Sequence, residues 1–133
     1  MGFNVQDANL KDSGALPASG GATAELVALD LEVQEEFHAP CELVIEAPAL
    51  SGGELPDGET VTYRVQHSAD GLSWSTLYGA VIVQTGASSS GADATEDRVR
   101  LPSNCERYVR VQAETSASAG DCSGSEAAES LRM

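Results

Sequence analysis

The chain has few positively charged residues. Its 133 residues include 7 Lys and Arg against 21 Asp and Glu, which gives a formal net charge of −14, and Lys11 is the only Lys or Arg before Arg64. Proteins that bind a nucleic acid backbone take their affinity from clustered Lys and Arg side chains. The composition therefore argues against a nucleic acid partner and indicates a strongly solvated surface.

Aromatic residues and long apolar runs are also scarce. The sequence has one Trp, three Tyr and two Phe, which limits it to a thin core. No run approaches the ~20 apolar residues that span a bilayer, and residues 1–10 have neither the basic nor the apolar region of a secretory signal. We expect a soluble, single-domain protein that is made in the cytosol and has no membrane partner.

Cysteine and histidine are too few and too scattered to form a metal or redox motif. Cys41, Cys105 and Cys122 include no C-x-x-C pair, and neither His38 nor His67 has a second ligand at helical spacing. We expect unpaired thiols in a reducing compartment, with one disulfide and a leftover thiol as the alternative.

No catalytic constellation is present either. Ser68, His67 and Asp70 are neighbours on one turn and cannot form a hydrogen-bonded relay, and there is no G-x-S-x-G motif. The acidic loops around residues 54–59 and 93–97 lack the ordered spacing of a calcium loop. We therefore predict no enzyme activity, no metal and no cofactor.

What the sequence does contain is period-2 alternation, and residues 60–66 show it best. Val61, Tyr63 and Val65 alternate with polar residues, a turn follows over residues 68–71, and Trp74 lies just beyond it. Trp74 is the largest apolar side chain available, so we place it with Tyr63 and Val65 at the centre of the core.

Further alternating or β-branched stretches predict strands at residues 25–33, 41–47, 80–84, 97–101 and 107–113, while residues 126–133 fit a closing strand or a short helix. About seven short strands with turns between them predict an all-β, antiparallel β-sandwich of jelly-roll-like form. Val44 is expected on a solvent face. The predicted core comprises Val27, Leu29, Leu31, Leu43, Ile45, Tyr63, Val65, Trp74, Val109 and Val111.

Two surface features are candidates for binding a partner. Residues 1–24 predict an extended arm ahead of a sandwich domain over residues 25–133, and its scattered apolar residues, Phe3, Val5, Leu10 and Leu16, could insert into a partner. Arg64, Arg98, Arg100 and Arg110 all fall on outward faces of predicted strands. They form either a cationic stripe that binds an acidic protein or cross-strand pairs with the chain's own carboxylates.

The order of three motifs gives a resemblance. Residues 12–15 precede a strand, residues 65–71 are followed by Trp74, and the pair at 101–102 is followed by the strand at 107–111. In this order the chain resembles the jelly-roll cement, or decoration, proteins of tailed-bacteriophage heads. The resemblance implies a homodimer or homotrimer on the outer surface of the virion, where it binds the major capsid protein and stabilises the shell.

A carbohydrate-binding sandwich is the alternative, with Trp74 or Tyr78 stacked on a sugar ring. This alternative requires Trp74 to be exposed rather than buried in the core.

Overall fold

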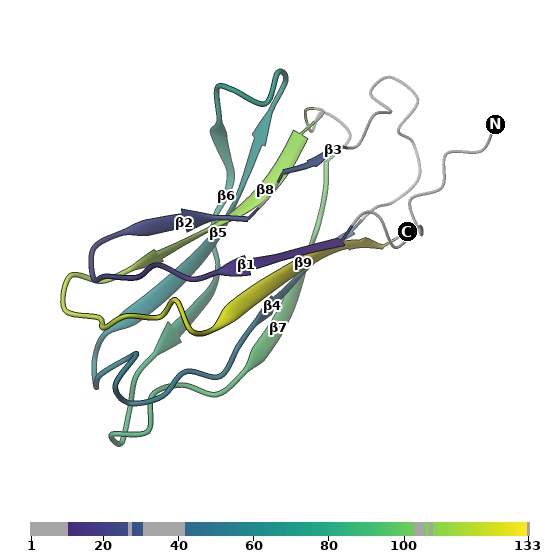
Figure 1. Ribbon diagram of the computed structural model, residues 1–133. Helices are drawn as coiled ribbons and strands as arrows, with labels where there is room; N and C mark the ends of the chain where they lie inside the picture. Colours follow the sequence, from purple (N-terminus) through teal and green to yellow (C-terminus); the bar gives the residue numbers. More distant parts are fainter. Residues whose placement is uncertain (1–10, 27, 31–41, 103–105, 107, 133) are drawn as a thin grey trace.

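The alternating stretches of the sequence form strands throughout the part of the chain that the structure describes. The computed structural model describes residues 11–26, 28–30, 42–102, 106 and 108–132. In these residues there is no helix, and so none that could cross a membrane. The strands are β1 Lys11–Ala15, β2 Thr23–Glu25, β3 Leu29–Asp30, β4 Glu42–Ala47, β5 Thr60–Ser68, β6 Ser75–Thr85, β7 Thr95–Arg100, β8 Tyr108–Thr115 and β9 Glu126–Arg132 (Figure 1).

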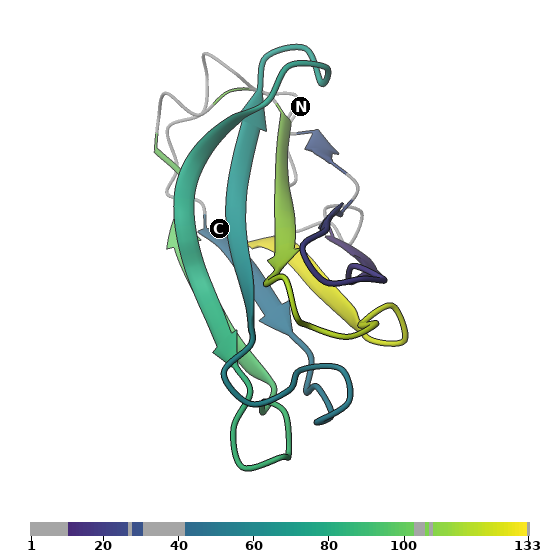
Figure 2. The ribbon, with the colours of Figure 1, turned by 90° about the vertical axis from the view of Figure 1, so that its left-hand side faces the viewer.

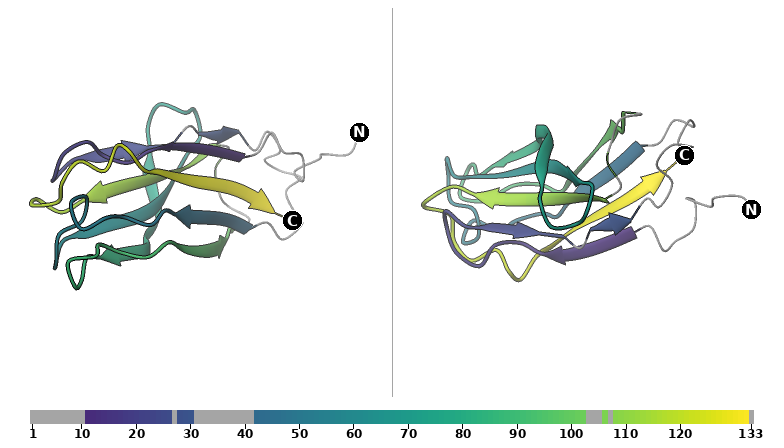
Figure 3. Two further views of the ribbon diagram at one scale, coloured as in Figure 1. Left: turned by 60° about the horizontal axis from the view of Figure 1, so that its bottom comes forward. Right: turned by 90° about the horizontal axis from the view of Figure 1, so that it is seen from above.

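The strands form two antiparallel sheets, which confirms the predicted β-sandwich. Sheet A has the order β1-β9-β4-β7, and sheet B has the order β2-β8-β5-β6 with β3 also paired to β8. Figure 2 looks onto sheet B, with β6, β5 and β8 side by side in front of sheet A. Loops gather at one end of the sandwich (Figure 3), where the Gly120 N–H donates to the Glu54 carbonyl oxygen.

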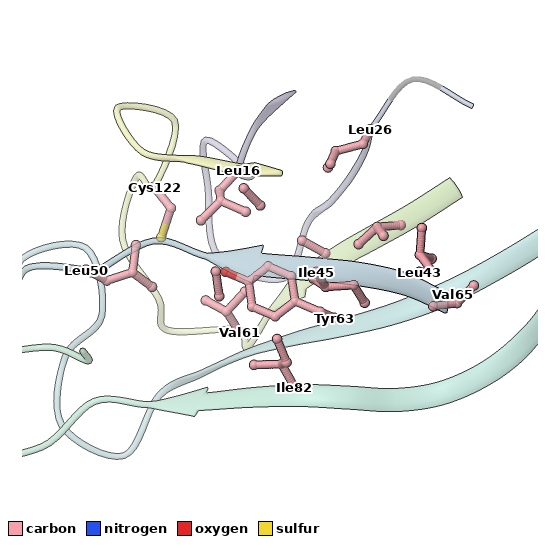
Figure 4. Packing of buried hydrophobic residues seen from close by; sticks show 14 of the residues in the cluster. Leu16, Leu26, Leu43, Ile45, Leu50, Val61, Tyr63, Val65, Ile82 and Cys122 are labelled. Carbon is pink, nitrogen blue, oxygen red and sulfur yellow. The ribbon is translucent and has the colours of Figure 1, made fainter. Parts of the chain in front are cut away.

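The core fills the space between the sheets, with Tyr63 of β5 at its centre (Figure 4). The Tyr63 hydroxyl donates to Gln84 Oε1 at 2.7 Å, and Gln84 Nε2 donates to the Pro48 and Asp93 carbonyl oxygens. Burial raises the pKa of Tyr63 far above its ordinary value, so the hydroxyl remains a donor. Burial is confirmed for these residues of the predicted core: Leu29, Leu43, Ile45, Tyr63, Val65, Val109 and Val111.

Two placements were wrong. Trp74 is only half-buried and does not belong to the core, because the turn before it carries it onto the outer face of sheet B. Val44 is fully buried although alternation placed it on a solvent face. It lies on a central strand, flanked in the register by Ser130 of β9 and Arg98 of β7. Val27 and Leu31 lie outside the described residues.

The strand predicted at residues 25–33 is interrupted. Glu25 pairs with Gln112 and Leu29 with Val109, so four steps along one strand match three along β8, the signature of a bulge. The Val111 N–H at this break donates to Glu129 Oε1 at 3.0 Å. Glu129 comes from β9 of the opposite sheet and is buried. A carboxylate between the sheets therefore satisfies an amide that the bulge takes out of the ladder.

The sandwich begins before the boundary predicted at residue 24. β1 pairs along its length with β9, and Leu16 directly after it is 2% exposed in the core. The prediction of an arm fails for residues 11–24, because they supply edge strands to both sheets. Phe3, Val5 and Leu10 lie outside the described residues.

The C-terminal segment, which the sequence left open between strand and helix, is a strand. β9 lies between β1 and β4 in sheet A. Its alternation is hard to see because the inward positions hold Ala127 and the buried acid Glu129. When a polar residue occupies an inward position, the alternation of apolar and polar residues that identifies a strand is lost.

Candidate functional site

Planar polar side chains gather on the outer face of sheet B. The buried positions of β5 and β8 are apolar except for Ser68 and Thr115 at one end of each strand, whereas the outward positions carry half-buried Arg64, Gln66, Arg110 and Gln112. The register places Arg64 opposite Gln112, and Gln66 opposite Arg110. Each strand thus contributes one guanidinium and one amide to the same patch.

Hydrogen bonds hold this patch in two cross-strand units. In the first, Arg64 Nη1 donates to Gln112 Oε1 at 2.8 Å and Arg64 Nη2 pairs with Glu114 at 2.9 Å. Gln112 Nε2 in turn donates to Glu25 Oε2 at 2.7 Å. In the second unit, Arg110 Nε donates to Gln66 Oε1 at 2.8 Å. Bonds between planar groups fix their orientation before any ligand arrives.

The loop between β5 and β6 bends over the upper end of this face (Figure 2). Asp70 Oδ1 accepts the N–H groups of Leu72 and Ser73 and the Ser68 hydroxyl, and the first of these bonds contributes most to lowering the pKa of Asp70. Gly71 has φ of 79°, in the left-handed region that favours glycine, and it faces the Tyr108 ring at a distance where a Cβ would make ordinary van der Waals contact. The predicted turn is confirmed, and it folds toward the outside of the sandwich.

Trp74 follows this turn and completes the site. Its ring lies 4.1 Å from the Arg110 guanidinium carbon, a cation–π contact. Since Arg110 faces outward from β8, Trp74 lies on the outer face of sheet B. We call Trp74 with Arg64, Gln66, Arg110 and Gln112 the Trp74 face.

Comparisons with known proteins leave the family open. No family model matches the sequence, and no curated protein matches it. Among solved structures, the chain is similar to a "Family 16 Carbohydrate Binding Module-2", with 12% sequence identity and a TM-score of 0.36 over 86% of this chain and 73% of that one. A likeness of this strength supports no argument about function, and the site has to be interpreted from its own residues.

The four arginines do not form the predicted stripe. Arg64 and Arg110 belong to sheet B, whereas Arg98 and Arg100 are on β7 of sheet A. Arg98 contacts Glu42 at 3.4 Å and Glu96 at 3.3 Å. Pairing with the chain's own carboxylates, the alternative considered for the stripe, is therefore confirmed for Arg64 and Arg98.

The remaining predicted groups have local structural roles. His67 Nδ1 accepts the Glu106 N–H at 3.2 Å. Glu54 accepts bonds from Ser51 N–H and the Ser125 hydroxyl, which tie neighbouring loops together. Within the described ranges, no group of three or more His, Cys, Asp or Glu side chains could hold a metal ion.

Cys122 is a free, buried thiol, as expected, while Cys41 and Cys105 lie outside the described residues. Burial, followed by the nearby charges of Glu54 and Asp121, raises the pKa of Cys122. A buried thiol with a raised pKa is a poor nucleophile.

A pocket of about 440 Å³ lies where β6 meets the loop before β7. Its lining is mostly small side chains, with Gln84 and Asp93 among the larger polar ones. Gln84 already bonds to Tyr63 and to two carbonyl oxygens. The pocket has no aromatic side chain in its lining, unlike the Trp74 face.

The sequence could have revealed more of this site than we predicted. Alternation correctly puts Gln66 and Gln112 on outward positions, but among the outward side chains of these two strands only the arginines are predicted to bind a partner. The signal that was available is a planar amide two residues from an arginine on each of two strands. Which strands are neighbours, however, depends on the sheet order.

Proposed function

We propose that this protein binds carbohydrate through the Trp74 face and catalyses no reaction. The observation that carries the proposal is the position of Trp74: the only tryptophan of the chain lies half-buried on the outer face of sheet B instead of in a core short of large side chains. Placing an aromatic ring there forgoes the apolar area that its burial would contribute. A binding role accounts for that loss.

The polar groups around the ring suit a sugar. Each sugar ring presents an apolar face of C–H groups and a rim of hydroxyls that both donate and accept hydrogen bonds. Trp74 offers an apolar surface, while Arg110 beside it and Gln66, to which Arg110 donates, offer planar polar groups for hydrogen bonds. A few polar groups fixed around an aromatic surface are typical of small-molecule recognition.

Binding to a phage capsid, which the resemblance implies, stays a prediction. The contacts expected for it were an arm whose residues Phe3, Val5 and Leu10 lie outside the described part, and a cationic stripe that the two sheets divide. Leu16, the fourth apolar residue of the arm, is in the core. The homo-oligomer, the major capsid protein as a partner and the location on the virion surface are likewise untested.

Affinity electrophoresis tests carbohydrate binding. The wild type would be run through native gels containing xylan, glucomannan, laminarin or polygalacturonate, together with Trp74→Ala and Leu72→Ala. Leu72 belongs to the same turn and is 84% exposed, so its variant controls for loss of an exposed apolar side chain. We expect at least one polysaccharide to retard the wild type and Leu72→Ala but not Trp74→Ala. The proposal is overturned if no gel retards the wild type, or if Trp74→Ala is retarded equally.

A further inference from the structure

The arginines of the described strands differ in how their charge is balanced. Arg64 pairs with Glu114 at 2.9 Å, and Arg98 contacts Glu42 and Glu96. These side chains are occupied by the protein's own carboxylates. An ion pair that is already formed leaves little charge for a ligand.

Arg110 differs from both. Its Nε donates to Gln66, its guanidinium stacks on Trp74, and no carboxylate within the described ranges forms an ion pair with it. Nη1 and Nη2 make no hydrogen bond to the described residues. In a chain with 21 acidic and 7 basic residues, a half-buried cation of this kind is unusual.

Two carboxylates close to the Trp74 face, those of Glu114 and Asp70, have partners other than Arg110. Glu114 is four residues from Arg110 on β8, about 14 Å along an extended strand, and it is already paired with Arg64. That separation exceeds the Debye length of about 8 Å at physiological salt. Asp70 of the adjoining turn has its Oδ1 bonded to the N–H groups of Leu72 and Ser73. Acidic residues therefore occur at both ends of the face, Asp70 in the turn before Trp74 and Glu114 at the far end, but among the described residues no carboxylate forms an ion pair with Arg110.

From the contacts of Arg110, which stacks on Trp74 and forms no ion pair with the described residues, we infer that the sugar bound by the Trp74 face is acidic, a uronic acid whose carboxylate binds Arg110. The inference rests on the proposed function and narrows it. A guanidinium offers parallel N–H groups that match the two oxygens of a carboxylate, and contacts with Gln66 and Trp74 already fix its plane. A uronic acid combines a ring that can stack on Trp74 with a carboxylate on the same ring.

The net charge of −14 does not prevent this contact. Repulsion between exposed charges beyond a Debye length is largely screened at physiological salt, whereas a hydrogen-bonded pair at contact distance is screened much less. The protein therefore repels a polyanion at low salt. It accepts the same polymer near physiological salt, where only the local contact at Arg110 matters.

The test compares polymers that differ only in the carboxylate. Binding of polygalacturonate, alginate and hyaluronan would be measured by calorimetry at about 0.15 M salt, each against its carboxyl-reduced form, in which the acid has become an alcohol. We expect the wild type to bind at least one acidic polymer about tenfold or more tightly than its reduced form.

Arginine variants assign that preference to one side chain. Arg110→Gln should lose it while keeping the wild-type melting temperature, and Arg110→Lys should recover only part of it, because an ammonium lacks the planar pair of donors. Arg100→Gln removes the same charge from β7 of sheet A and should keep the preference in full.

The inference is overturned if no acidic polymer is preferred to its reduced form, or if Arg110→Gln and Arg100→Gln behave alike. Carbohydrate binding itself is judged separately. If the reduced polymers bind as well as the acids and Trp74→Ala abolishes both, the proposed function survives and the acidic ligand does not. If neither form binds and no polysaccharide gel retards the protein, both proposals fail.

Discussion

At the scale of single residues, the buried pair of Tyr63 and Gln84 links the centre of the core to the loops at one end. We expect Tyr63→Phe to lower the free energy of unfolding by about 1–3 kcal/mol, since it leaves Gln84 Oε1 buried without its donor. Denaturant unfolding measures the change.

Tyr78→Phe is the matched control for this substitution. The Tyr78 hydroxyl donates to the Arg100 carbonyl oxygen at 2.6 Å in an exposed position, where water can replace it. We expect a change within about 0.5 kcal/mol. Equal losses in the two variants would show that burial of the Tyr63 bond adds nothing.

The sequence predicts the core residues well where alternation is clear. It places Trp74, the largest side chain of the chain, in the core, and that placement is wrong. Val61, Tyr63 and Val65 are inward as expected. Trp74 follows a turn, and alternation along a strand cannot assign a residue beyond a turn to the inner or outer face. The prediction that Trp74 is buried therefore depends on the size of its side chain alone. Size favours burial on average, but it does not reveal tertiary contacts such as the one between Trp74 and the Arg110 guanidinium on the outer face.

At the scale of elements, the β5–β6 turn depends on an ionised Asp70. Its bonds to backbone amides hold the pKa of Asp70 below the unfolded value. Because the pKa of Asp70 is lower in the folded state than in the unfolded state, its ionised carboxylate stabilises the fold. This stabilisation is fully present above about pH 4 and is lost as pH falls through the folded pKa. We expect wild type to be more stable than Asp70→Ala at neutral pH, and the difference to shrink in acid.

Asp70→Asn separates titration from hydrogen bonding, because an amide oxygen still accepts but does not titrate in this range. Denaturant unfolding at about pH 7 and about pH 2 compares the three proteins. The stability difference between Asp70→Asn and Asp70→Ala should hardly change with pH. A wild-type advantage over Asp70→Ala that is as large in acid as at neutral pH would contradict the role assigned to Asp70.

Strands with clean alternation were predictable as elements, and irregular ones were not. The β5 and β8 patterns stand out in the sequence. The sequence does not show the break between β2 and β3, or that Glu129 of β9 points inward. These two irregular features depend on each other, because the bulge takes the Val111 N–H out of the ladder and Glu129 accepts its hydrogen bond. Such a pair becomes recognisable only when the two sheets are in contact.

At the scale of the whole molecule, the sequence predicted a sandwich but not which strands share a sheet. Alternation places four arginines on outward faces of strands. If these strands were neighbours in one sheet, the arginines would form one stripe. The sheet order assigns two of them to each sheet, and the two groups have different neighbours. The four arginines therefore do not act as one cationic stripe, and Arg110 is the cation that lies beside Trp74.

The account depends most on the Trp74 face being the ligand-binding surface. Backbone and side-chain amide NMR spectra, recorded while neutral and acidic oligosaccharides are added, test this directly, since the only tryptophan gives a single indole N–H signal. We predict that the largest shifts fall on the indole of Trp74, the amides of Gln66 and Gln112, and Arg110 Nε. Shifts confined to the pocket beside Gln84 and Asp93, or no shifts with any oligosaccharide, would contradict it.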